Sequence, residues 1–225
     1  MIEAPEPSAR ILDHLEDAMT PQDIEALFTR ESGDFVFARW GRPLSPVVFG
    51  VDDATLSVIK GALEAVCVLS NHKMAETDPE LGSNLMMFFF KEWSELLDVP
   101  GLDRLVPDLG PLVEKLQAVE ANQYRLFRFD EAGAIKACFV FLRMDQHLSA
   151  VPAQTLALSQ IVQSFLLWSD TAFKEKSPLV VADGTTILRP DVAELLRAAY
   201  DPVLPPAAQD ASHALRLFAR LSKPQ

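Results

Sequence analysis

Asp145 and His147 are the two side chains whose types and spacing come closest to a catalytic pair. A carboxylate and an imidazole can act as general acid and base when a loop brings them together, and both lie in the polar stretch Met144-Asp145-Gln146-His147. The same stretch is typical of a polar loop in which an aspartate caps the next helix. The other histidines are far apart in the sequence: His14, His72 and His213. Histidines that bind a metal from one helix stand a turn apart, so the spacing predicts no metal site.

The elements that must position this pair follow from the hydrophobic pattern. The expected strands are 35–40, 47–50, 84–91, 124–129 and 135–143. The expected helices are two within 8–30, then 53–70, 93–99, 109–119, 152–169, 191–200 and a last amphipathic helix near the C-terminus. A long helix between two strands is the connection that a parallel pair requires. We therefore expect an α+β fold with a mixed twisted sheet, a long backing helix, an edge hairpin and a C-terminal helical part.

A chain of 225 residues suits one structural domain. Within it we distinguish an N-terminal helical segment at 1–34, an α+β part at 35–206 and a C-terminal amphipathic helix at 207–225. Opposite its apolar side this last helix carries basic residues, which offer a contact surface on an otherwise acidic chain: Arg216, Arg220 and Lys223.

The helix expected from Pro152 to Ser169 carries polar residues in the pattern Ser-Gln-x-x-Gln. Its apolar residues share one face: Leu158, Ile161, Val162, Phe165 and Trp168. Its polar residues fall largely outside that face: Ser159, Gln160, Gln163 and Ser164. On the residues alone, this pattern is typical of an amphipathic surface helix with a solvated polar face.

Three other segments are distinctive: Arg39-Trp40-Gly41-Arg42-Pro43, the strand Ala137 to Arg143, and 188–202, where an aspartate starts a helix that ends in Leu-Arg-x-x-Tyr. They resemble segments of metzincin-type zincins, and most closely of an uncharacterised family of proteobacterial zincin-like proteins. The resemblance covers about 35–206. It implies a sheet with one long backing helix, followed by an active-site helix below the edge strand. Residues 137–142 are the candidate for that exposed edge strand.

The resemblance also implies that the metal site has degenerated. The two helix histidines of a zincin would fall on Ser159 and Gln163, the catalytic glutamate on Gln160, and the third ligand near Ser169 or Asp170. Serine and glutamine are poor zinc ligands, and a glutamine cannot take a proton from water as a carboxylate can. A zincin has a glycine at the bend where this chain has Leu166, so we expect the helix to continue past that position.

Composition narrows the range of partners and cofactors. The formal net charge of −12 argues against nucleic acids and anionic membranes. No apolar run approaches the length of a membrane span, and the acidic, proline-bearing start lacks the features of a secretory signal, so a cytoplasmic location is expected.

No glycine-rich phosphate loop occurs, and no cofactor is expected. Cys67 and Cys138 are isolated in apolar surroundings, which is typical of buried thiols rather than a disulfide framework.

Two functions from different classes remain open. The first is a zincin-like domain without catalysis that binds a peptide or protein segment, which adds to the exposed edge strand as a further strand. The second is a hydrolase of another class that uses Asp145 and His147, with Asp170, in the same cleft. Peptidase activity by the zincin mechanism is not expected in either case.

Overall fold

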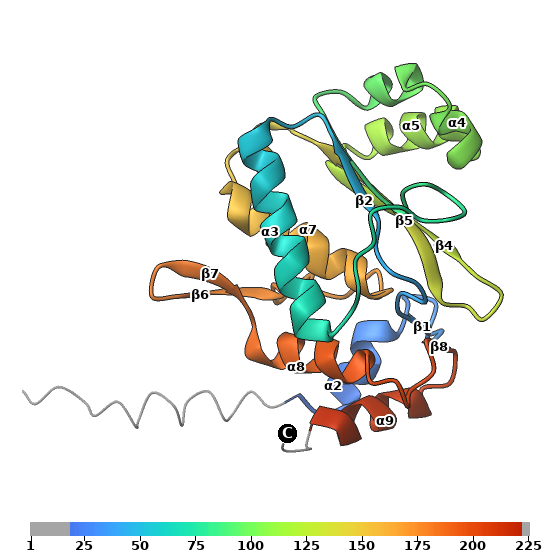
Figure 1. The fold of residues 1–225 in the computed structure, drawn as a ribbon, viewed down its shortest axis with the longest axis vertical. Coiled ribbons are helices and arrows are strands. Elements are labelled where there is room, and N and C mark those ends of the chain that lie inside the picture. The colour runs from blue at the N-terminus through green and yellow to red at the C-terminus, as the bar shows by residue number, and fades with distance from the viewer. Residues whose placement is uncertain (1–18, 222–225) are drawn as a thin grey trace, which may run out of the picture.

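The computed structural model describes residues 19–221, and within this range four strands form the largest sheet. Their order is β2 (Pro46–Phe49), β3 (Leu85–Phe90), β5 (Ile135–Arg143) and β4 (Gln123–Phe129). The pairs β2–β3 and β3–β5 are parallel, whereas β4 is antiparallel to β5. This mixed sheet, with helices packed around it, confirms the predicted α+β class (Figure 1).

The continuous apolar run at 85–90 forms a central strand, as predicted. Five of the six side chains of β3 are buried, because both faces of the sheet are covered. Alternate residues of β3 and β5 enter two separate hydrophobic clusters, one on each face. Leu85, Met87, Cys138 and Val140 belong to the larger cluster, whereas residues such as Met86, Phe88, Phe139 and Phe141 belong to the smaller one.

Two helices cover the face of the larger cluster. The backing helix α3 (Asp53–Ser70) lies across the sheet, and α7 (Ala153–Phe165) packs against it (Figure 1). The Asp52 carboxylate starts α3 by accepting the Thr55 N–H at 2.7 Å, and Asn71 ends it in the left-handed conformation. Asparagine tolerates that conformation better than most residues, so both ends of the crossover helix are defined by the sequence.

Short helices cover the opposite face. The 3₁₀ helix η2 (Trp93–Asp98), where the sequence predicts a helix, is followed by α4 (Leu102–Leu105) and α5 (Leu109–Ala118). Beyond β5, α6 (Gln146–Ser149) leads into α7.

The two buried thiols, Cys67 and Cys138, are both free. Desolvation raises their pKa values to about 11 and about 12.

A second group of elements lies below the sheet (Figure 1). It comprises α2 (Pro21–Phe28), β1 (Phe37–Ala38), β8 (Ala207–Ala208), α8 (Pro190–Ala199) and α9 (Ser212–Leu221). The helix α9 packs against both α2 and α8, and β1 pairs with β8 in antiparallel fashion. The Thr20–Asp23 capping box fixes the start of α2. The helix predicted before α2 lies outside the described residues. The division of the chain into the parts 1–34, 35–206 and 207–225 stays a prediction.

Two predictions about the elements are wrong. The strand 137–142 is not the edge, because β5 lies between β3 and β4 and leaves β4 outermost. The helix predicted to reach Ser169 ends at Phe165, and Leu166 is extended. Residues 179–188, for which the sequence analysis lists no strand, form a hairpin of β6 (Leu179–Ala182) and β7 (Thr185–Leu188). Between residues 19 and 221, no helix is both long and apolar enough to span a membrane.

Candidate functional site

The outer edge of β4 is the first component of the candidate site. The Arg143 N–H donates to the Asn122 carbonyl at 2.8 Å, and these residues are opposite each other in the register that continues through β4. Hydrogen-bonded and non-hydrogen-bonded pairs alternate along an antiparallel ladder. The backbone N–H and C=O groups of Gln123, Arg125 and Phe127 therefore point away from β5. Among the described residues no strand pairs with this edge.

The side chains of the same three β4 residues face α7. Arg125 donates from Nη2 to the Gln160 Oε1 atom, and Gln160 donates from Nε2 to the Gln123 Oε1 atom at 3.1 Å. Gln160 is only 2% exposed. Its amide thus links the edge strand to α7 through two contacts.

The Arg125 guanidinium is buried beneath β4, and its Nε has no hydrogen-bond partner among residues 19–221. Desolvation lowers its pKa to about 10, so the guanidinium is still protonated at neutral pH. A protonated arginine donates hydrogen bonds and accepts none. At the position where the resemblance implies a catalytic carboxylate, the chain therefore has an amide held by a cation.

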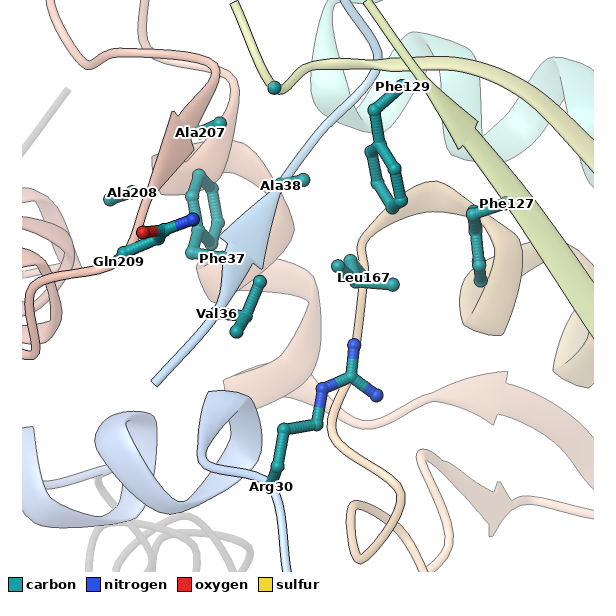
Figure 2. A pocket seen from close by; sticks show the side chains of 11 residues that line it. Arg30, Val36, Phe37, Ala38, Phe127, Phe129, Leu167, Ala207, Ala208 and Gln209 are labelled. Atoms are coloured by element: carbon teal, nitrogen blue, oxygen red, sulfur yellow. The ribbon is translucent and has the colours of Figure 1, made fainter. Parts of the chain in front are cut away.

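A cavity of about 520 Å³ lies at the far end of β4. Figure 2 shows the rings of Phe127 and Phe129 from β4 on one side of it, with Leu167 below and Val36 and Phe37 opposite. Ala207 and Ala208 of β8 close the remaining side, and Arg30 reaches in from the end of α2 (Figure 2). The walls thus come from segments far apart in the sequence, and most of them are apolar.

Aromatic side chains hold the C-terminal end of α7 in place. The last four carbonyls of a helix lack partners within it. Here the Trp168 Nε1 donates to the Val162 carbonyl at 3.0 Å, and the Trp40 Nε1 to the Ser164 carbonyl at 2.9 Å. The Tyr200 hydroxyl donates to the Phe165 carbonyl at 2.8 Å. Three side chains therefore satisfy three of these four carbonyls.

Trp40 and Tyr200 come from two of the segments that carry the resemblance, 39–43 and 188–202. Tyr200 also accepts the Trp40 backbone N–H at 3.5 Å. Beyond the capped end, Leu166 bridges to Arg39, and the Leu167 N–H donates to the Ala38 carbonyl at 2.9 Å. The caps stop the helix at Phe165 and the bridges turn the chain into the cavity wall, which explains why the predicted continuation past Leu166 is wrong.

Of the remaining positions of the degenerate metal site, Ser159 and Gln163 contact each other, whereas Asp170 contacts Glu31 instead. Ser159 and Gln163 are partly buried, and the Gln163 Nε2 donates to the Ser159 Oγ at 2.8 Å. Asp170 is exposed and accepts the Glu31 N–H at 3.2 Å. The solvated-face interpretation of α7 is wrong for Gln160 and Ser164, which are both buried.

The pair Ser159 and Gln163 allows a test of this geometry. Because their side chains already meet one helical turn apart, the double variant Ser159→His with Gln163→His should bind Zn²⁺ through two imidazoles. Zinc at about 100 times its dissociation constant should then raise the free energy of unfolding by about 2.7 kcal/mol, measured by urea unfolding. The single variant Gln163→His is the control. A double variant that responds to zinc no more than the single one would contradict the placement of these side chains.

The candidate acid–base pair does not form. Asp145 caps α6 by accepting the Leu148 N–H at 2.8 Å, and it also contacts Asn122 and Arg143. His147 is exposed on α6, and no hydrogen bond joins the two side chains in the described part of the chain. Asp145 lies next to the residue that precedes β4, whereas the cavity lies at the other end of that strand. The capping interpretation of Asp145 is therefore confirmed.

Arg30, Arg125 and Phe127 are the residues of the site that the sequence analysis missed. Arg30 follows a short helix and has no neighbouring motif. Arg125 and Phe127 carried a signal, because they alternate with Leu126 in the predicted hairpin. That alternation places them on one face of the sheet, although it does not reveal which strand is outermost.

Comparison with known proteins gave no match: neither a family model, nor a curated protein, nor a solved structure is significantly similar to this chain. Within residues 19–221, no three His, Cys, Asp or Glu side chains form a group that could hold a metal ion. The features of the structure that bear on function are therefore the edge of β4, its contacts with α7 and the cavity.

Proposed function

We propose that this chain is a zincin-like domain without peptidase chemistry that binds an extended peptide along β4. The architecture supports the fold part of this proposal. Three parallel strands are followed by an antiparallel edge strand, a long backing helix and a second helix on the same face. That second helix, α7, contacts the edge strand through Gln160. A long backing helix and a further helix beside the edge strand are what the resemblance of 35–206 implies, although the edge strand is β4 and not 137–142.

The single observation that carries the binding part is the open edge of β4 beside an apolar cavity. An extended peptide can add to such an edge through main-chain hydrogen bonds, while pockets select alternate side chains. The two arginines of β4 contact other groups of the chain: Arg125 contacts the Gln160 amide and Arg128 contacts the Leu105 carbonyl.

The chemistry of the same residues supports binding without cleavage. Peptide hydrolysis at a zincin site needs a metal and a carboxylate that accepts a proton from water. Gln160 supplies an amide, and the adjacent Arg125 supplies hydrogen-bond donors alone. Neither group can accept a proton at neutral pH.

The proposal predicts a two-residue period in the peptide. The probe is a library of acetylated, amidated heptapeptides with a central leucine and random flanking positions. The tightest binder is resynthesised with each backbone nitrogen methylated in turn. Methylation at every second residue should weaken binding at least about tenfold, because each lost main-chain bond leaves an unpaired group. Methylation at the intervening residues should have little effect. The measurement is fluorescence anisotropy with a labelled peptide.

A pair of variants at Phe127 tests the protein side of the same bonds. Phe127→Pro removes an N–H that points away from β5, and proline is tolerated where a strand's N–H faces outward. Phe127→Ala keeps the N–H and removes the ring, so it is the matched control. Binding should be weaker in the proline variant than in the alanine variant. Equal affinities, or a library in which no peptide binds, would contradict the proposal.

A further inference from the structure

Arg30 places a positive charge in the wall of the cavity. It follows α2 and lies in a turn, where its N–H donates to the Asp34 carbonyl at 2.9 Å and its carbonyl accepts the Gly33 N–H at 2.9 Å. The turn directs the side chain into the cavity, and Figure 2 shows its guanidinium beside Leu167 and across from Phe127. The residue is partly buried. Within residues 19–221, its guanidinium makes none of the observed hydrogen bonds or ion pairs.

The nearby carboxylates are committed to other groups. Glu31, the next residue, pairs with the Lys174 ammonium at 2.7 Å, and Asp170 accepts the Glu31 N–H. Asp34 accepts the Ser32 hydroxyl at 2.7 Å. A guanidinium is strongly attractive to a carboxylate at such a site, because the two groups can form parallel hydrogen bonds.

We infer that the cavity selects a peptide that carries a bulky apolar residue and, two residues away, an Asp or Glu whose carboxylate pairs with Arg30. The inference depends on the proposed function. Side chains two residues apart project from the same face of an added strand. A strand on β4 therefore directs two such side chains toward the α7 side, where Phe127, Leu167 and Arg30 line one cavity. The apolar walls accept the first side chain and Arg30 accepts the second.

The net charge of the whole chain cannot produce a preference for acidic residues in the peptide. At a net charge of −12 the protein as a whole repels acidic peptides. A preference for acidic residues at one position must therefore come from a nearby cation, and Arg30 is the guanidinium in this cavity. Reversing its charge should reverse the preference at that position and leave the others unchanged.

The test uses the same heptapeptide library on the full chain and on three variants. Wild type should enrich Asp and Glu at least about tenfold at the position two residues from the central leucine on one side. Arg30→Glu should enrich Lys and Arg there. Arg30→Met, which keeps an unbranched apolar stem, should lose the charge preference and retain leucine selection. Arg197→Glu, at an exposed residue of α8, should behave as wild type and controls for a change in net charge.

The outcomes separate this inference from the proposed function. If peptides bind with the two-residue methylation period but the acidic preference is absent, or survives in Arg30→Glu, the inference is wrong and the binding mode stands. If no peptide binds, both are wrong. Self-association of the wild type that Arg30→Glu abolishes, measured by sedimentation velocity, would identify a second copy of the chain as the occupant and would also overturn the inference.

Discussion

Replacing Tyr200 by phenylalanine is expected to lower the free energy of unfolding by about 2 kcal/mol, within a range of about 1–3 kcal/mol for buried groups left unpaired. The variant keeps the ring and removes one hydroxyl. That hydroxyl donates to the Phe165 carbonyl and accepts the Trp40 N–H, so two backbone groups lose their partner. Because both groups are buried at the end of α7, water cannot replace the bonds without opening the core.

Urea unfolding followed by tryptophan fluorescence measures this effect. The chain has two tyrosines, and Tyr124→Phe is the matched control. Tyr124 packs its ring near Phe141, and its hydroxyl makes no hydrogen bond among the described residues. Trp40→Phe should resemble Tyr200→Phe, because it removes the donor to the Ser164 carbonyl. A Tyr200→Phe variant as stable as Tyr124→Phe would show that the capping of α7 contributes little.

Stability is also expected to fall by about 2 kcal/mol between pH 7 and pH 5 because of His213 alone. His213 is 2% exposed, packs on Phe37 with 4.4 Å between ring centroids, and has no hydrogen-bond partner on either ring nitrogen within residues 19–221. Desolvation lowers its pKa to about 4, and Arg216 and Arg39 act in the same direction. The unfolded chain takes up the proton near pH 6.5, whereas the folded chain excludes it.

The pKa values of His213 in the unfolded and the folded chain set the direction of the change in stability and the pH range in which it occurs. The contribution of His213 is fully present above pH 6.5 and is lost as the pH falls toward 4. Desolvation also lowers the pKa of the partly exposed His72 to about 4, so it adds a smaller loss in the same window. Aspartates with lowered pKa values, such as Asp78, act only at lower pH, so the range from pH 6.5 to pH 5 reports on the histidines.

The control for this pH profile is a pair of single variants. His213→Leu should remove most of the pH dependence of urea unfolding between pH 7 and pH 5 and leave only the smaller part that His72 contributes. His147→Ala, at an exposed histidine of α6, should leave the wild-type slope unchanged. A His213→Leu protein that retains the full slope would contradict the assignment.

The local elements of this fold could be predicted because their signals lie within a few residues. The capping box at Thr20 and Asp23 and the cap at Asp52 fixed helix starts. The end of α7 could not be predicted from its own residues. It is set by Trp40 and Tyr200, which are separated from Phe165 by 125 and 35 positions and become neighbours only in the folded chain.

The sequence predicted an edge strand as the candidate site, but it did not predict which strand forms that edge. The expectation that an edge strand runs beside α7 was reasonable, yet the sequence could not show that β4 rather than β5 is outermost. Strand order depends on long-range pairing, here of β3 with β5. The sequence drew attention to Gln160 but could not show its contact with Arg125, because the arginine comes from a strand 35 positions away.

The contacts of Gln160 with Arg125 and Gln123 have a mechanical consequence. They join the edge strand to the helix beneath it, so the strand and the helix can separate only if these two part-buried hydrogen bonds break. A groove of fixed width loses little conformational entropy when it is filled. Most of the conformational entropy lost on binding would then come from the peptide. A rigid or cyclised peptide should therefore bind more tightly than a flexible one of the same composition.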